Sequence, residues 1–222
     1  TRKESSAASD VYKRQRYMGM NILPNILPKF NKNYPNIEII IREENTRVLE
    51  NLVLGGNVDF ALTHVHKKEM NEKINYEILK KDEFLLVTPK SYLMNSDKIK
   101  VKDGKSYVDL RDLEGEKFIL LDINKGIRKV QDRTIKSYGI NPEVVFTTKN
   151  FETAKRLAAN GMGITIIPKD YLNIFSQDKS YDSFNLSGTE ENIWYTAILT
   201  IPDIYKSQAT KVFIDEVKRF FK

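Results

Sequence analysis

The sequence predicts an α/β fold built as two lobes. Short apolar runs typical of buried strands alternate with segments in which apolar residues recur at helical spacing, and this alternation is typical of α/β layers. The clearest case lies within residues 150–168, where a helical stripe, a helix-ending glycine and a buried strand follow one another: Phe151, Ala154, Leu157 and Ala158, then Gly161, then Ile164 to Ile167 before Pro168. A similar series occurs earlier, in residues 37–63, so the pattern indicates two α/β units joined by more than one crossing.

The elements of the first unit come early in the chain. Apolar residues at helical spacing predict a helix from Ile22 to Phe30, and the β-branched run from Ile37 to Ile41 predicts a strand buried on both faces. Thr46 is expected to N-cap the next helix, which ends at Gly55, before a second buried strand from Val58 to Thr63. A strand, a helix and a strand in this order predict a right-handed crossover in a parallel sheet.

The second unit is predicted from a longer series of the same kind. Its elements are a strand from Phe84 to Val87, a short helix within Val108 to Leu113, a strand from Phe118 to Leu121, a helix capped by Asn124 and ended by Gly139, and a strand from Val144 to Thr147 that leads into residues 150–168. After them we expect a weak helix up to Phe175, a strand from Trp194 to Ile201 and a final helix capped by Ser207.

We place the two crossings near Leu85 to Pro89 and near Asn185 to Thr189. Lobe I then comprises residues 16–86 and 187–222, and lobe II comprises residues 87–186. Because ligands of open α/β sheets bind outside the carboxyl ends of the strands, this layout predicts a ligand cleft between the lobes.

The composition is that of an ordinary globular protein. Of the 222 residues, 41% are hydrophobic and 30% are charged, which is enough interior for two lobes without disulfide staples. The absence of cysteine excludes a disulfide framework, a cysteine-based metal site and a cysteine nucleophile. The net charge of +6 arises from 36 basic and 30 acidic residues scattered along the chain, a distribution that favours a solvated surface over a direct nucleic-acid face. No apolar run approaches the roughly 18 residues of a membrane span.

The N-terminus stands apart from the rest of the chain. Residues 5–15 read Ser-Ser-Ala-Ala-Ser-Asp-Val-Tyr-Lys-Arg-Gln and resemble the in-frame translation of a common sequencing adapter. We therefore interpret residues 1–15 as a non-native leader, the alternative being a polar, disordered leader. Neither interpretation includes the apolar segment of a signal peptide, and we expect the native sequence to start at Arg16.

Four segments carry a resemblance to a known family. They are Leu-Pro-Lys-Phe-Asn-Lys-Asn-Tyr-Pro-Asn-Ile-Glu-Ile at 27–39, Asn-Leu-Val-Leu-Gly-Gly-Asn-Val-Asp-Phe-Ala-Leu at 51–62, Phe-Ile-Leu-Leu at 118–121, and Leu-Ala-Ala-Asn-Gly-Met-Gly-Ile-Thr-Ile-Ile-Pro at 157–168. In this order and spacing they resemble the effector-binding domain of LysR-type transcriptional regulators. The resemblance implies a two-lobed periplasmic-binding-protein-like fold of type 2, each lobe a mostly parallel sheet flanked by helices. It also implies a preceding winged helix-turn-helix, which is not seen in this sequence, and a first strand that here falls in the adapter-like leader.

The function that the resemblance implies is that of a sensor in a cytoplasmic bacterial regulator. The domain would bind a small-molecule effector, with a small carboxylate the expected class, and thereby modulate DNA binding by the helix-turn-helix part, with no contact to a membrane. It would form a homodimer or tetramer through lobe I, by way of the segments Ile22 to Phe30 and Ile37 to Ile41. The alternatives are the solute-binding receptor of a transporter, or an enzyme on the same fold.

Six residues are candidate effector contacts: Tyr17, Thr46, His64, Asn124, Asn150 and Phe151. The resemblance implies that Thr46 is a polar residue at a cleft-lining helix N-terminus and that Asn150 and Phe151 form a strand-to-helix corner of the effector pocket, with Asn124 a similar case. Free N–H groups at a helix N-terminus favour an anion, although Thr46, Asn124 and Asn150 could each serve only as a cap. Phe151 could equally be a core aromatic residue, and Tyr17 lies where the resemblance places the entry of the first cleft loop into its helix. His64 is expected to line the cleft beyond a strand end, whereas His66 is expected to be exposed. We identify no catalytic constellation, cofactor motif or third metal ligand, so the sequence does not predict an enzyme.

Overall fold

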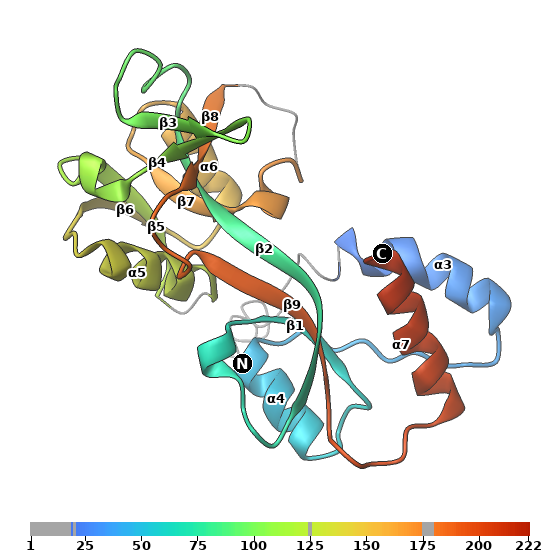
Figure 1. The fold of residues 1–222 in the computed structure, drawn as a ribbon. Coiled ribbons are helices and arrows are strands. Elements are labelled where there is room, and N and C mark those ends of the chain that lie inside the picture. Colours follow the sequence, from blue (N-terminus) through green and yellow to red (C-terminus); the bar gives the residue numbers. More distant parts are fainter. Residues whose placement is uncertain (1–18, 20, 124–125, 175–179) are drawn as a thin grey trace, which may run out of the picture. The chain divides into compact units, whose positions relative to one another are not determined.

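The computed structural model describes residues 19, 21–123, 126–174 and 180–222. The chain folds into two compact units, which we call the first unit (residues up to 81 together with 195–222) and the second unit (residues 82–194). The chain passes between them within strands β2 (Asn75–Pro89) and β9 (Ile193–Thr200), rather than after residues 86 and 186 (Figure 1). No helix in the described ranges is long and apolar enough to cross a membrane.

The first unit packs helices on both faces of a small antiparallel sheet. Strand β1 (Ala61–Val65) pairs antiparallel with β9, and neighbouring residues of β9 face opposite sides. Ile198 packs with α3 (Leu23–Asn33) and α7 (Gln208–Phe220), while Ala197 and Leu199 pack with α4 (Thr46–Leu54). A 3-10 turn (Lys67–Glu69) follows β1. The predicted helices are confirmed, and Ser207 caps α7 by accepting a hydrogen bond from the backbone N–H of Thr210.

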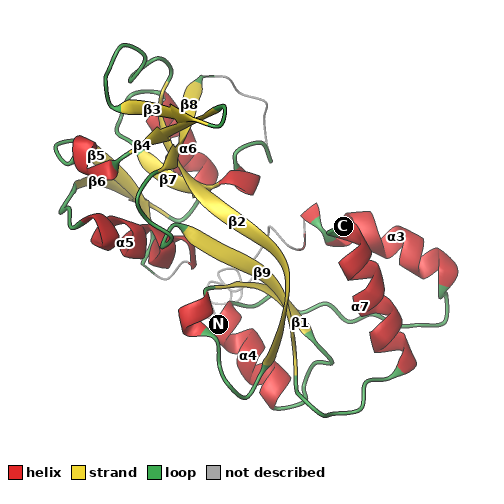
Figure 2. Ribbon diagram, in the orientation of Figure 1, coloured by secondary structure: helices red, strands yellow, loops and turns green. Residues whose placement is uncertain are grey.

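The strand predicted from Ile37 to Ile41 is wrong. This segment lies in the loop between α3 and α4 (Figure 2), with Ile37 and Ile39 partly buried against α3 and α7. Ile40 and Ile41 are 77% and 49% exposed, so only alternate residues reach the core. A β-branched run favours extended backbone but becomes a strand only where another strand supplies hydrogen bonds. The predicted parallel crossover therefore fails too, and β1 starts at Ala61 instead of Val58.

The second unit contains mixed sheets. Strand β2 pairs antiparallel with β7 (Thr165–Pro168) and β8 (Tyr181–Leu186), and the hairpin of β3 (Ile99–Lys102) and β4 (Lys105–Val108) joins β8 through a parallel pairing. Strand β5 (Lys117–Leu121) runs parallel to β6 (Glu143–Thr148), and Phe118 bridges to Ile164 in parallel. The expectation of mostly parallel sheets thus holds only for part of this unit, whereas the predicted series from Phe118 to Ile167 is confirmed.

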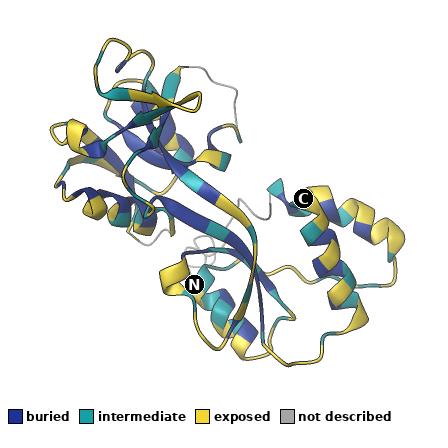
Figure 3. Cartoon of the chain, viewed as in Figure 1, coloured by how far each residue is buried: buried dark blue, intermediate teal, exposed yellow. Residues whose placement is uncertain are grey.

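The helices of the second unit cover these strands. They are α5 (Gly126–Tyr138) and α6 (Phe151–Ala159), with 3-10 turns at Leu110–Leu113 and Lys169–Tyr171. The second of these turns replaces the longer helix expected up to Phe175, which itself lies outside the described residues. Residues 84–88 of β2 are all buried in this unit, a stretch drawn in dark blue in Figure 3.

The connection from α6 to β7 depends on two glycines. Gly161 has a φ of +79° and Gly163 a φ of +147°, which side-chain-bearing residues rarely adopt. At Gly163 a Cβ atom would lie 2.7 Å from the carbonyl oxygen of Lys117, because the adjacent Ile164 N–H donates to that same oxygen at 2.8 Å. Gly163 therefore permits the tight approach of β7 to β5, whereas Gly161, where a Cβ would meet nothing within 4 Å, serves the turn that ends α6.

Candidate functional site

In the first unit, Thr46 and His64 lie together. Helix α4 begins at Thr46, but its N-cap is Asn45, whose Oδ1 accepts a hydrogen bond from Val48 N at 3.1 Å, so the prediction that Thr46 caps the helix is wrong. The Thr46 hydroxyl instead donates to the backbone oxygen of His64 at 3.1 Å and lies 2.8 Å from the hydroxyl of Thr63. Since a hydroxyl has a single proton, Thr63 donates in the second bond. The pair ties the start of α4 to β1.

His64 is a neutral side chain near pH 7. Burial, and then the positive charge of Lys80, lowers its pKa from 6.5 to about 3. It therefore cannot supply positive charge to an anionic ligand, although its ring can exchange a hydrogen bond. His66 is buried, contrary to expectation, at 8% exposure, because its Nδ1 accepts a hydrogen bond from Lys68 N at 3.3 Å and closes the turn after β1. In the described part of the chain, no three His, Asp or Glu residues gather as a metal site.

In the second unit, Asn150 and Phe151 form the start of α6. Asn150 caps the helix through Oδ1, which accepts from Glu152 N at 2.9 Å, and its own N–H donates to the Thr148 hydroxyl at 3.2 Å. The side chain is exposed, and its Nδ2 makes no hydrogen bond to the described residues. Phe151 is half-buried against Tyr171, with ring centroids 4.7 Å apart. The corner thus presents an amide donor beside an aromatic ring.

The buried ion pair of Lys155 and Glu152 in α6 was not predicted. Lys155 is fully buried, and its Nζ lies 2.8 Å from Glu152 Oε2 and donates to Leu172 O at 2.8 Å. The same ammonium lies 5.6 Å from the centre of the Tyr181 ring, and Arg156 donates to Glu152 Oε1 at 2.9 Å. The only signal in the sequence was a set of opposite charges three and four residues apart. It was missed because the helix stripe was assigned from apolar residues.

The structure places four of the six candidates and groups them in two pairs. Thr46 and His64 meet in the first unit, and Asn150 and Phe151 are adjacent in the second. Tyr17 and Asn124 lie outside the described residues.

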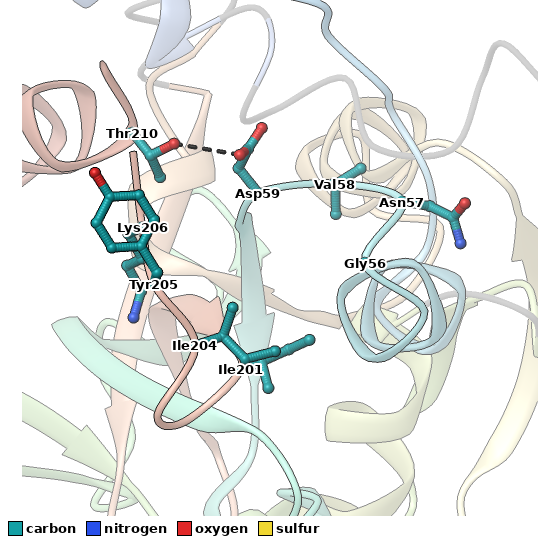
Figure 4. Close-up of a pocket in the computed structure, with 9 residues that line it drawn as sticks. All are labelled: Gly56, Asn57, Val58, Asp59, Ile201, Ile204, Tyr205, Lys206 and Thr210. Carbon is teal, nitrogen blue, oxygen red and sulfur yellow. Dashed lines mark hydrogen bonds between the residues drawn. The ribbon is translucent and has the colours of Figure 1, made fainter. Parts of the chain in front are cut away.

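The first unit also has a hollow that none of the candidates lines. It encloses about 210 Å³ beside the loop after α4 and the N-terminus of α7 (Figure 4). Here the hydroxyl of Thr210 donates to Asp59 Oδ1 at 3.3 Å, a bond that joins the loop before β1 to α7. Its lining residues are Gly56, Asn57, Val58, Asp59, Ile201, Ile204, Tyr205, Lys206 and Thr210.

Comparison with known proteins decides the family. The family model described as the LysR substrate binding domain matches residues 16–222. The chain belongs to this family. The resemblance found in the sequence motifs is therefore confirmed, and it extends over all the described residues.

The relatives of this LysR domain are transcriptional regulators. A probable RuBisCO transcriptional regulator of Trieres chinensis is 26% identical over 207 residues, which cover 90% of this chain and 64% of that protein. Among solved structures, the Synechocystis CcmR regulatory domain in complex with 2-PG is 16% identical with a TM-score of 0.71, covering 90% of this chain and 91% of that one. The BenM effector-binding domain with benzoate is 18% identical with a TM-score of 0.71, covering 92% and 90%. At these identities the structures confirm the two-lobed α/β fold.

Proposed function

We propose that this domain is the effector sensor of a transcriptional regulator. A small molecule binds it and changes how the whole protein binds DNA and controls transcription. The observation that carries the proposal is the family match over residues 16–222, together with relatives that are transcriptional regulators. The chain spans 64% of the length of the first of these relatives, and DNA binding is assigned to a part beyond this domain. Since the relatives are regulators, nothing favours the transporter-receptor alternative.

The effector that best fits the candidate groups is a small carboxylate. The N-terminal turns of α4 and α6 carry partial positive charge, and Asn150 Nδ2 adds a donor to one of them. Phe151 offers an apolar face for the body of the ligand. Benzoate, bound in the BenM domain, has this combination of a carboxylate and an apolar ring. We therefore propose that one effector uses Thr46 and His64 of the first unit and Asn150 and Phe151 of the second.

We further propose that the protein is cytoplasmic, is not an enzyme, and acts as a homodimer or tetramer through the first unit. The surface that supports self-association is the α3 helix with the segment 37–41, where Ile40 and Ile41 are largely exposed. Adjacent exposed apolar side chains are the material of an interaction surface, which supports self-association through this segment. Light scattering at micromolar concentration is expected to give twice the monomer mass of 25.8 kDa, or more.

The function is tested by a thermal-shift screen of the chain against small carboxylates, with benzoate included. A ligand present at about 100 times its dissociation constant stabilises the folded state by about 2.7 kcal/mol, which raises Tm by roughly 5–10 °C in a protein of this size. We expect at least one carboxylate to give such a shift. A panel in which neutral sugars or amines stabilise the chain and carboxylates do not would contradict the assigned ligand class.

The site is tested with variants that each change a single polar group. Asn150→Asp retains the cap oxygen but replaces the amide donor with a negative charge, so the affinity for a carboxylate should fall about tenfold or more, equivalent to about 1.4 kcal/mol. Thr46→Val removes the hydroxyl that ties the first turn of α4 to β1 and should weaken binding, whereas Thr46→Ser keeps this hydroxyl and should not. Thr210→Val, which removes a comparable hydroxyl beside the hollow, is the matched control and should bind like wild type. Equal affinities in all four variants would place the effector elsewhere.

A further inference from the structure

A line of buried side chains joins the start of α6 to the place where the chain leaves the second unit. The Phe151 ring contacts Tyr171, and the Tyr171 ring lies 5.8 Å from that of Trp194, edge to face at 62°. Trp194 in turn meets Phe84 at 4.8 Å and 79°, and its Nε1–H donates to Asp82 Oδ2 at 3.3 Å. Tyr171, Trp194 and Asp82 are 5%, 5% and 3% exposed, so each ring orients its neighbour in a packed interior.

The far end of this line coincides with both crossings of the chain. Asp82 and Trp194 are the first and last residues of the second unit, and the residues next to them, Lys81 and Tyr195, belong to the first unit. A hydrogen bond between Asp82 and Trp194 therefore ties the two crossings together. A second tie lies beside it, because Asn192 O accepts from Phe84 N at 2.7 Å and Asn192 Nδ2 donates to Phe84 O at 3.0 Å.

We propose that Asp82 and Trp194 are positioning residues that couple the start of α6 to the two crossings. Asp82 holds the indole, the indole holds Tyr171, and Tyr171 sets the ring of Phe151 and with it the first turn of α6. A displacement of one ring then displaces the next, because closely packed rings leave no space for one of them to move alone. A structural change at the crossings therefore reaches the start of α6. The coupling itself is a property of the free protein. That an effector acts on the crossings through this line rests on the proposed function, in which the effector contacts Phe151.

The coupling is tested without effector, by residue-resolved amide hydrogen exchange. The reporters are the N–H groups of Glu152 and Ala154, which donate to Asn150 Oδ1 at 2.9 Å and Asn150 O at 3.1 Å, and the reference is Ile119 N–H in β5. In Asp82→Leu, which removes the acceptor of the indole, we expect exchange of the two reporters to rise at least about fivefold more than that of the reference, because their opening is local. Asp82→Asn retains an acceptor oxygen and should stay within about twofold of wild type.

Leu110→Ala is the control for general loosening, since Leu110 is fully buried in the same unit but is not a member of the line. This variant should raise the exchange rates of the two reporter N–H groups and of the reference N–H group by one common factor. Trp194→Phe keeps a ring without the donor and should repeat the selective effect if Asp82→Leu fails to fold. Exchange that rises uniformly in the Asp82 or Trp194 variants, or that does not rise at all, overturns the coupling. A positive result together with failure of the ligand screen would leave the coupling standing and remove only the proposed effector site.

Discussion

At the scale of single residues, the fold fixes the hydrogen bond of the Thr46 hydroxyl and the neutral state of the His64 ring. The Thr46 hydroxyl gives its proton to the backbone oxygen of His64, so a ligand carboxylate could take that proton only by displacing this bond. The backbone N–H groups of the helix turns and the amide of Asn150 are therefore the readier donors. His64 contributes no charge, since burial keeps its ring neutral.

His64 also gives a prediction about pH. Its folded-state pKa of about 3 lies below the ordinary 6.5, so between these values the unfolded chain binds more protons and acid destabilises the fold. The effect begins as the pH falls below about 7 and grows as the pH falls toward 3. Between pH 7 and pH 5, the free energy of unfolding of wild type, measured by urea titration, should fall by roughly 1–2 kcal/mol. That of His64→Gln should not show this fall. Parallel pH profiles for the two proteins would refute the assigned shift.

At the scale of elements, α6 carries both the second half of the candidate site and an unusual buried ion pair. The sequence predicted its apolar stripe, and Ala154 and Ala158 are indeed fully buried. The turn after α6 depends on Gly163, and the buried ion pair depends on Lys155 and Glu152. Single substitutions at these residues should therefore change the stability of the fold.

Lys155→Met tests the buried pair. The change leaves Glu152 paired with the largely exposed Arg156 and removes a donor from Leu172 O, so we expect the free energy of unfolding to fall by roughly 2–4 kcal/mol. Lys211→Met, on the exposed face of α7, should change it by less than about 0.5 kcal/mol in the same urea titration. Adding Glu152→Gln to Lys155→Met should recover part of the loss, and a double variant less stable than the single one would argue against an uncompensated charge.

Gly163→Ala tests the approach of β7 to β5. The added methyl group meets the Lys117 oxygen and the backbone must leave its φ of +147°, so roughly 2–4 kcal/mol of stability should be lost. Gly115→Ala is the natural control, because a Cβ there meets nothing within 4 Å. Similar unfolding midpoints for the two alanine variants would show that this contact is not tight.

At the scale of the whole molecule, the parts predicted correctly are those encoded by local patterns. The series from β5 to β7 follows from periodicity and glycine positions, and the cap of α7 follows from a serine placed just before its first turn. The predicted strand at 37–41 failed because strand formation depends on a partner far along the chain. The cap at Asn45 and the burial of His66 also escaped prediction, since neighbouring residues compete for the same role and only tertiary contacts decide between them.

The same limit applies to the site. Helix starts and a strand end were recognisable and, together with the family resemblance, allowed Thr46, His64, Asn150 and Phe151 to be named from the sequence. The ion pair of Lys155 and the line from Phe151 to Asp82 could not, because they join segments that are distant along the chain and carry no periodic signal.

The central claim is that one small carboxylate is recognised by groups of both units. Its most direct test is an amide chemical-shift titration of the isotope-labelled chain with benzoate and the carboxylates found in the screen. The account predicts that the amides of residues 46–48 and of 150–152 shift together, with one common dissociation constant. Shifts confined to one unit, shifts centred on the hollow beside Asp59 and Thr210, or no saturable shift with any carboxylate would contradict it.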